Sequence, residues 1–346
     1  MIMMNPIQSS VAATSKDTES DQQQVINLSQ LPKTKGFLGS SALSLYQGFW
    51  YPSRIVPNVI SFQTHFQARD DDIILASKPK SGTTWLKALV FSIVNRTRYT
   101  PSNTPLLASN PHQLVPFIEF TLFADVLQKN SAVKVPDLSG IPSPRLFSTH
   151  IPYSSLPESV KDSKCRIMYI CRNPLDVIVS SWHFGTQDHP DRARSVWTNM
   201  EEYVDKFCNG EEGFGPFWDH VLAYLKVSLE KPEKVLFLKY EDMKEETIFQ
   251  VKRIAEFIGF PFSEDEEIRG VVKEISDLCS LSSLKDLEVN KNGKFMPNFE
   301  NKSYFRKGEV GDWVNLLSLS MAERVSKVSE EKLKGSGLTF KMSSYL

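Results

Sequence analysis

The sequence contains only four cysteines, and their spacing is typical of neither a disulfide-rich nor a metal-binding protein. They stand far apart, at Cys165, Cys171, Cys208 and Cys279. A zinc site or a redox pair would require closely spaced pairs such as C-x-x-C. We therefore expect reduced and mostly buried thiols, as in a cytoplasmic protein, and no metal site.

Long apolar runs and an excess of charge of one sign are also missing. No stretch approaches the ~18 apolar residues of a transmembrane helix, and no apolar signal core follows the first Met. The 40 basic and 41 acidic residues leave a net charge of −1, which excludes the basic surface of a typical nucleic-acid-binding protein. We expect a soluble cytoplasmic protein with no nucleic-acid or membrane partner, in which any anion site is a local cluster of Lys and Arg.

The N-terminal residues differ in composition from the rest of the chain. Residues 1–30 are rich in Ser, Gln, Thr and Asp and poor in aromatics, so they bury too little apolar surface to offset the entropy of ordering. A transit peptide is the alternative, but the acidic residues and the absence of Arg argue against one. We predict a disordered tail over residues 1–30 and one domain over residues 31–346, which is long enough to bury a sizeable core.

The segment K-P-K-S-G-T-T-W at 78–85 lies between an apolar run at 73–77 and apolar periodicity that ends near Arg96. This order predicts a strand, a tight loop and a helix. Unpaired N–H groups and the dipole at the start of such a helix favour an anion. A loop with a simple Ser or Thr cap is the alternative, but the motif is longer than a cap requires. The predicted ligand is a phosphate.

The loop differs from the common nucleoside-triphosphate version. There, a Lys follows the last Gly and is followed by Ser or Thr, whereas here Lys80 precedes the S-G-T-T run. No acidic partner for magnesium is obvious in the sequence. These differences argue against hydrolysis of ATP or GTP.

Two further predicted strands end in polar residues. Residues 145–149 lead to His150, and the apolar run at 166–171, typical of a buried parallel strand, leads to Arg172. Ligands of α/β proteins bind where such strands end, although an Arg here is also able simply to pair with Asp176. We predict an α/β fold with a central, mainly parallel sheet flanked by helices. We interpret the other histidines as ordinary surface or packed residues: His65, His112, His183, His189 and His220.

Four more segments allow predictions from their sequence. Phe117, Phe120 and Phe123 at spacing i, i+3, i+6 predict an aromatic stripe on one helical face, either in a lid over a flat substrate or in the core. Residues 200–230 and about 265–275 are expected to be helical. The run R-K-G-E-V-G-D-W at 306–313 suits a phosphate approached by a guanidinium and backbone amides; a surface turn is the alternative for R-K-G alone.

Four motifs, in this order, resemble those of the cytosolic sulfotransferases, and of the plant soluble branch in particular: P-K-S-G-T-T-W-L-K-A-L, T-H-I-P, C-R-N-P…S and R-K-G-E-V-G-D-W. The resemblance extends from about residue 31 to residue 340. It implies one α/β sulfotransferase domain. It also implies transfer of a sulfuryl group from 3′-phosphoadenosine 5′-phosphosulfate (PAPS) to a hydroxyl of a small lipophilic or aromatic acceptor, without a metal.

The resemblance also implies roles for individual residues. His150 corresponds to the general base, and Lys80 to the cation that neutralises charge during transfer. Either Ser280 or Ser282 touches the nucleotide, because two registers fit. The resemblance assigns the 5′-phosphate to Ser81, Gly82, Thr83 and Thr84, the 3′-phosphate to Arg172, Ser180, Arg306 and Lys307, and the adenine to Trp85 and Tyr240, with Gly308 in the same cofactor site.

Two positions depart from the family pattern. Lys78 stands where many members have an aromatic residue, and Ser148 stands where animal members carry a second sulfonate-binding Lys that plant members commonly lack. The alternatives are a P-loop small-molecule kinase that needs ATP and magnesium, or a catalytically weak PAPS-binding homologue, which Lys78 favours.

The acceptor and the oligomeric state are less constrained. The aromatics near Trp50, Tyr51 and Phe117 suggest a flat or lipophilic alcohol. Flavonoids, steroids, hydroxyjasmonates and glucosinolate precursors are all open. The Lys-Thr-Val dimer motif of animal members is missing near the C-terminus, which favours a monomer.

Overall fold

A computed structural model describes residues 27–36, 42–124, 135–187, 199–296 and 299–341. The chain divides into two units, residues 1–31 and 32–346. The described part of the first unit contains one 3-10 turn, η1 (Leu28–Gln30), whose Ser29 N–H donates to the Asn27 side chain. The predicted tail lies, up to residue 26, outside the described residues.

The second unit is built on a four-stranded parallel sheet with strand order β5-β4-β6-β7. The sheet confirms the predicted α/β fold. Every residue of the central strand β4 is buried, as expected for a parallel strand covered on both faces. The strands are β4 (Ile73–Ser77), β5 (Leu146–Thr149), β6 (Arg166–Cys171) and β7 (Val235–Lys239).

Helices and two smaller antiparallel sheets complete this unit. The smaller sheets consist of β1 (Lys33–Lys35), β2 (Ala42–Tyr46) and β3 (Phe49–Pro52), and of β8 (Lys294–Met296) and β9 (Phe299–Glu300). The α-helices are α1 (Val56–His65), α2 (Thr83–Asn95), α3 (Pro111–Leu114), α4 (Glu158–Asp162), α5 (Pro174–Gln187), α7 (Met200–Cys208), α8 (Phe217–Glu230), α9 (Tyr240–Glu245), α10 (Thr247–Ile258), α11 (Glu264–Ile268), α12 (Val271–Leu278), α13 (Leu281–Asp286), α14 (Glu288–Asn292) and α15 (Leu319–Leu333). Short helical turns are η2 (Ser53–Ile55), η3 (Pro105–Leu107), η4 (Ile118–Leu122), η5 (Tyr153–Ser155), η6 (Asn301–Tyr304) and η7 (Asp312–Asn315).

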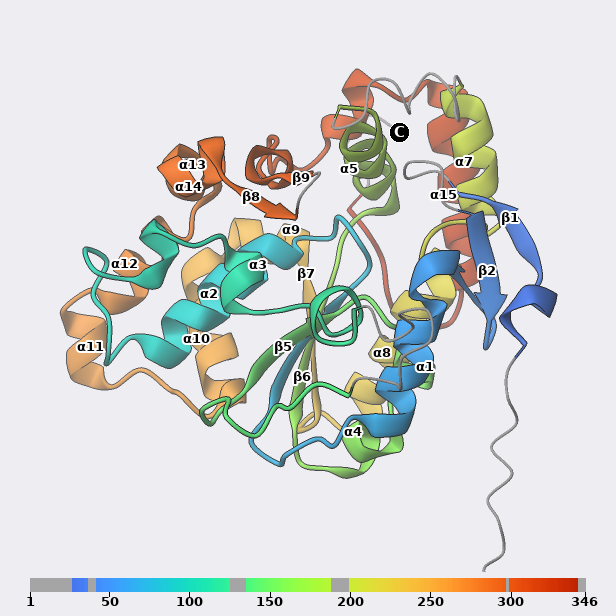
Figure 1. The fold of residues 1–346 in the computed structure, drawn as a ribbon. Coiled ribbons are helices and arrows are strands. Elements are labelled where there is room, and N and C mark those ends of the chain that lie inside the picture. Colours follow the sequence, from blue (N-terminus) through green and yellow to red (C-terminus); the bar gives the residue numbers. More distant parts are fainter. Residues whose placement is uncertain (1–26, 37–41, 125–134, 188–198, 297–298, 342–346) are drawn as a thin grey trace, which may run out of the picture. The chain divides into compact units, whose positions relative to one another are not determined.

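Helices cover both faces of the parallel sheet (Figure 1). On one face, Met168 and Ile170 of β6 join a buried apolar cluster with residues of α2 and α10. Tyr169 points to the other face, because side chains alternate along a strand, and its ring stacks on Tyr224 of α8 with centroids 4.2 Å apart. In the part of the chain that the structure describes, no helix is long and apolar enough to cross a membrane.

Two predicted helices are each interrupted by a left-handed glycine. The stretch 200–230 forms α7 and α8, separated by a turn in which Gly210 has φ 78°. The stretch 265–275 is divided into α11 and α12 at Gly270, with φ 79°. A left-handed residue ends a right-handed helix. Each predicted helix is therefore divided in two, although the apolar periodicity of the sequence continues across the break.

The prediction of one aromatic stripe is wrong. Residues 118–122 form a π-helical turn, in which the Phe123 N–H donates to the Ile118 carbonyl five residues back. This turn is wider than an α-turn, so the three rings do not follow one helical face. Phe117 and Phe120 lie beside His150, whereas Phe123 is buried in the core.

Parallel strands have all their carboxyl ends at one edge of the sheet. The loops after β4, β5 and β6 therefore begin close together, with Lys78, His150 and Arg172 as their first residues, and Tyr240 follows β7. This is the edge at which open α/β sheets bind ligands.

Candidate active site

The loop between β4 and α2 has a backbone shaped for an anion. Lys80 and Gly82 have positive φ values of 69° and 108°, and a Cβ at Gly82 would lie 2.7 Å from the Tyr240 ring. At position 82, only Gly avoids both the strain of a positive φ and the clash of a Cβ with Tyr240. The loop delivers the N-terminus of α2, which starts at Thr83, to the edge of the sheet. The Ser81 hydroxyl is buried without a hydrogen-bond partner among the described residues, as expected for a group that awaits a ligand.

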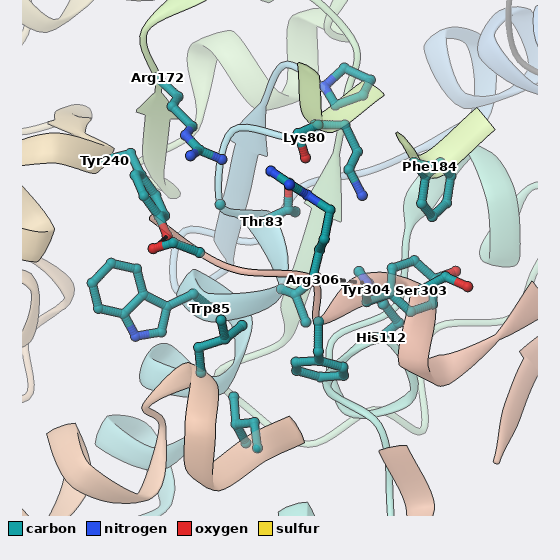
Figure 2. Close-up of a pocket in the computed structure, with 18 of the residues that line it drawn as sticks. Lys80, Thr83, Trp85, His112, Arg172, Phe184, Tyr240, Ser303, Tyr304 and Arg306 are labelled. Carbon is teal, nitrogen blue, oxygen red and sulfur yellow. Dashed lines mark hydrogen bonds between the residues drawn. The ribbon is translucent and has the colours of Figure 1, made fainter. Parts of the chain in front are cut away.

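Three cationic side chains from distant segments converge on this loop. Figure 2 shows Lys80, Arg172 and Arg306 directed toward the space above Thr83. All of them line a cavity of 1510 Å³, and the Lys80 ammonium lies 3.8 Å from the centre of the Phe184 ring. The other predicted cofactor residues that line the cavity are Gly82, Thr83, Thr84, Trp85, Ser180, Tyr240 and Gly308.

Arg172 is buried and held in place by three groups. Its guanidinium lies 3.3 Å from Asp176, contacts the carbonyl of Glu309 and lies 4.4 Å from the centre of the Tyr240 ring. Asp176 also accepts from the Gly311 N–H at 2.9 Å. The ion pair with Asp176 considered from the sequence is therefore present, and Arg172 still lines the cavity because the pair uses one edge of its guanidinium.

Asp312 organises the second pair of cations. Its carboxylate lies 2.5 Å from Arg306 and 2.6 Å from Lys307 and accepts from Asn315 at 2.9 Å. Burial alone would raise the pKa of Asp312, but the hydrogen bonds from Lys307 and Arg306 hold it at about 2. Lys307 is 46% exposed and is not among the residues that line the cavity. Arg306 is thus the cation that this loop presents.

Aromatic and small residues form another part of the cavity wall. The rings of Trp85 and Tyr240 meet edge to face with centroids 5.5 Å apart, and the Tyr240 hydroxyl donates to the Gly308 carbonyl at 2.8 Å. A Cβ at Gly308 would lie 2.7 Å from a methyl carbon of Leu281. Of the two serines left open by the sequence, Ser280 lines the cavity.

His150 has the tautomer and protonation state of a base. Its Nδ1 lies 2.8 Å from the carbonyl O of Ser77. A carbonyl only accepts, so Nδ1 carries the hydrogen and Nε2 holds the free lone pair. Burial lowers the pKa of His150 to about 3, although the hydrogen bond to Ser77 opposes this shift. The imidazole is therefore neutral at physiological pH.

The backbone of His150 is fixed by two buried side chains that sequence reasoning missed. Its N–H donates to Glu119 at 2.7 Å, and its carbonyl accepts from His220 Nε2 at 2.9 Å. Nδ1 of His220 in turn lies 2.9 Å from the Tyr169 hydroxyl. The position of His220 beside apolar Val221 and Phe217 was the available signal, since a His among core residues needs polar partners.

Comparison with known proteins identifies the family to which these features belong. Residues 70–337 match the family model of the sulfotransferase domain. The chain belongs to the sulfotransferase family. Cytosolic sulfotransferase 15 of Arabidopsis thaliana is 49% identical over 320 residues, which cover 91% of this chain and 86% of the relative. Cytosolic sulfotransferase 12 of the same plant is 48% identical over 337 residues, or 96% and 98% of the two chains.

Solved structures show the same fold. The structure of an Arabidopsis thaliana protein described as a steroid sulphotransferase has 42% identity and a TM-score of 0.70, and covers 96% of this chain and 100% of that one. The structure of a mouse sulfotransferase complexed with PAP (adenosine 3′,5′-bisphosphate) has 27% identity and a TM-score of 0.63. It covers 85% of this chain and 96% of that one.

In this sulfotransferase, three aromatic rings lie next to His150, and a buried ion pair lines the same cavity. The rings of Phe117, Phe120 and Phe214 have centroids 4.7, 6.1 and 5.4 Å from that of the imidazole. The Lys78 ammonium lies 3.0 Å from Glu212 Oε1 and donates to the Gly213 carbonyl at 2.8 Å. Both ion-pair residues line the cavity.

The remaining positions singled out from the sequence lie elsewhere. The Ser148 hydroxyl donates to the Pro116 carbonyl at 3.1 Å and does not line the cavity. Tyr51 is fully buried, and neither it nor Trp50 is a lining residue. Among the described residues, no group of three or more His, Cys, Asp or Glu side chains is arranged to hold a metal ion.

Proposed function

We propose that this sulfotransferase transfers the sulfuryl group of PAPS to a hydroxyl of a small lipophilic acceptor in the cytosol. The observation that carries the proposal is the convergence of Lys80, Arg172 and Arg306 on the cavity that also contains the neutral imidazole of His150. PAPS is anionic at both ends of its nucleoside, and cations from three distant segments match that charge distribution. The cytosolic relatives and the mouse complex with PAP support the same donor and compartment.

The loop after β4 is proposed to bind the 5′ end of the donor. Backbone N–H groups at the start of α2 and the hydroxyls of Thr83 and Thr84 supply donors there. The buried hydroxyl of Ser81 has no partner within the described structure. Because Ser81 does not line the cavity, its assignment to the 5′ end rests on the resemblance of the motif. A site built this way suits the tetrahedral oxygens of a phosphate.

The opposite side of the cavity is proposed to bind the rest of the nucleotide. Arg172, Arg306 and Ser180 suit the 3′-phosphate, because both guanidinium groups have a buried Nε without a hydrogen-bond partner in the part of the chain that is described. Trp85 and Tyr240 suit the adenine, with Ser280 next to them. Lys307 would act mainly through Asp312 and through long-range attraction.

His150 and Lys80 are proposed to carry the chemistry. As the acceptor oxygen bonds to sulfur, Nε2 of His150 takes the hydroxyl proton. At the same time the bond between sulfur and the 5′-phosphate oxygen breaks, and Lys80 neutralises the charge that develops on that oxygen. The protein mainly aligns the reactants and stabilises charge in such a reaction.

The acceptor is proposed to be a flat or lipophilic alcohol. Phe117, Phe120 and Phe214 surround the imidazole, and aromatic walls of this kind bind apolar rings. The Lys78–Glu212 pair in the same part of the cavity offers hydrogen bonds to a polar substituent of that acceptor.

A transfer assay with sulfur-labelled PAPS and a panel of phenols and steroid alcohols, in excess EDTA, tests this function. We expect a labelled sulfate ester and stoichiometric adenosine 3′,5′-bisphosphate (PAP) without ATP turnover. ATP turnover that needs magnesium would identify a small-molecule kinase instead. Tight PAP binding without single-turnover transfer to any acceptor would identify a binding-only homologue.

Replacing Arg306 with alanine should weaken PAP binding. A hydrogen bond to a charged group contributes about 1.5–3 kcal/mol, so we expect Kd from titration calorimetry to rise about 10- to 150-fold. Lys307→Ala is the matched control and should have a smaller effect, because Lys307 is exposed and does not line the cavity. Adenosine 5′-monophosphate, which has no 3′-phosphate, should bind equally to both variants and to the wild type. An unchanged Kd for PAP in Arg306→Ala would place the 3′-phosphate elsewhere.

The pH dependence of kcat/KM should show the lowered pKa of His150. An ordinary His, with a pKa near 6.5, would lose about 30-fold in active base between pH 8 and pH 5. Since burial lowers the pKa of His150 to about 3, we expect kcat/KM to stay flat over this range at saturating PAPS. Burial also raises the pKa of Glu119 to about 7. An inflection near pH 7 that disappears in Glu119→Gln therefore belongs to that carboxyl, whereas one that persists would contradict the prediction.

A further inference from the structure

A fully buried lysine lies on the helix that follows the loop after β4. Lys87, on α2, is 0% exposed, and it is not among the residues that line the cavity. Its ammonium lies 2.9 Å from Nδ1 of His112 and 3.3 Å from the centre of the Phe117 ring. Lysine is almost never fully buried without a specific partner, so this contact requires an explanation.

His112 connects that lysine to the cavity. Its ring is buried between Phe117 and Tyr304, with centroids 5.2 and 4.3 Å away, and Figure 2 shows it next to Tyr304. Its Nε2 lies 3.1 Å from the hydroxyl of Thr84. Both Thr84 and His112 line the cavity. Lys87, His112 and Thr84 thus form a continuous chain of hydrogen bonds that ends at the cavity wall.

The chemistry of the three groups sets the direction of this chain. Burial lowers the pKa of His112 well below its ordinary value, and the charge of Lys87 lowers it further, so the imidazole is neutral and has one N–H and one lone pair. In its charged form, Lys87 only donates, so in that form Nδ1 is the acceptor and the hydrogen lies on Nε2. Nε2 then donates to the Thr84 oxygen, which leaves the hydroxyl hydrogen of Thr84 available to a ligand.

An anion at the loop would strengthen the same arrangement. Burial lowers the pKa of Lys87 well below its ordinary value, and the Glu119 carboxylate opposes that shift. The face of the Phe117 ring favours the charged form as well. A bound anion on the far side of Thr84 acts in the same sense, so anion binding and the charged form of Lys87 favour each other.

We propose that Lys87 acts through His112 to orient the hydroxyl of Thr84 as a hydrogen-bond donor to the 5′ group of the bound nucleotide. Lys87 does not line the cavity and is a positioning residue in this arrangement, whereas His112 lines the cavity and relays the effect of Lys87 to Thr84. The inference rests on the proposed function, because it takes a nucleotide to lie with its 5′ end against the loop of residues 80–84.

The experiment is a binding cycle with two ligands. Kd for PAP and for adenosine 3′-monophosphate, which lacks the 5′-phosphate, is measured by calorimetry for the wild type, Lys87→Met, Thr84→Val and the double variant. We expect each single variant to weaken PAP binding about fivefold, in the range of one hydrogen bond, and the double variant to be no weaker than Thr84→Val. Thr84→Ser keeps the hydroxyl. In that background, adding Lys87→Met should therefore still raise Kd for PAP about fivefold. Binding of the 3′-monophosphate should not change in any variant.

Several results would overturn the proposal. If Lys87→Met weakens PAP binding equally in the Thr84→Val background, the lysine acts by direct attraction and not through Thr84. If binding of the 3′-monophosphate weakens in parallel with binding of PAP, the variants disturb the site as a whole. Should Lys87→Met fail to fold, His112→Leu breaks the same chain of hydrogen bonds and is expected to weaken PAP binding in the same way. Because His112 lines the cavity, unchanged binding of the 3′-monophosphate is then the control against direct contact with the rest of the nucleotide. A wild-type chain that binds neither ligand would instead refute the proposed function, which separates the two failures.

Discussion

Replacing His150 with alanine is expected to lower kcat about 10²- to 10⁴-fold, the usual contribution of a general base. The reason is the arrangement at the end of β5. The hydrogen bond from Nδ1 to the Ser77 carbonyl leaves Nε2 unprotonated, and burial lowers the pKa of His150 to about 3. The measurement is the steady-state rate of sulfate-ester formation at saturating PAPS and acceptor.

Two controls separate loss of the base from loss of structure. His150→Asn removes the basic nitrogen but keeps an N–H able to reach the Ser77 carbonyl, so its rate should fall as far as that of the alanine variant. The affinity of both variants for PAP should stay at the wild-type value, because the cations proposed to bind the nucleotide, Lys80, Arg172 and Arg306, lie on other segments. A rate near that of the wild type in His150→Ala would mean that a different group accepts the proton.

Replacing Lys78 with methionine is expected to lower the free energy of unfolding by about 3–5 kcal/mol, the usual cost of removing one partner from a buried ion pair. Lys78 and Glu212 are buried, with 1% and 8% of their side chains exposed. Burial raises the pKa of Glu212, and Lys78 opposes that shift, so without the lysine the carboxylate would lose its charged partner. The measurement is equilibrium unfolding in denaturant at neutral pH.

A second substitution and an exposed pair test that explanation. Lys78→Met combined with Glu212→Gln removes both charges and should recover most of the lost stability. The ion pair of Lys273 and Asp277 has side chains that are 73% and 64% exposed, so Lys273→Met should leave the unfolding midpoint almost unchanged. If the double variant is as unstable as Lys78→Met alone, loss of packing, and not an uncompensated charge, is the cause.

The same pair is expected to affect acceptor binding. Lys78 and Glu212 line the cavity that also contains His150, so the double variant should change KM for the acceptor more than Kd for PAP. The ion pair thus gives the proposed acceptor site two buried charged groups beside its aromatic rings.

The sequence by itself determined the sheet and the residues at its edge. Apolar runs at 73–77 and 166–171 predicted parallel strands, and the residues that follow them, from Lys78 to Gly82 and Arg172, lie at the strand ends as expected. This success has a simple physical reason. The end of a buried strand and the start of the next helix are local events, and they are controlled by neighbouring residues.

Only the tertiary structure decided which side chains support that edge. His112 contacts Lys87 across 25 residues, and His220 contacts His150 across 70, so no local pattern relates the members of either pair. The breaks at Gly210 and Gly270 likewise depend on a backbone conformation that the apolar periodicity does not reveal. A lone His or a buried Lys acquires its role from the groups that the fold places around it, because its protonation and hydrogen bonding depend on burial and on nearby charge.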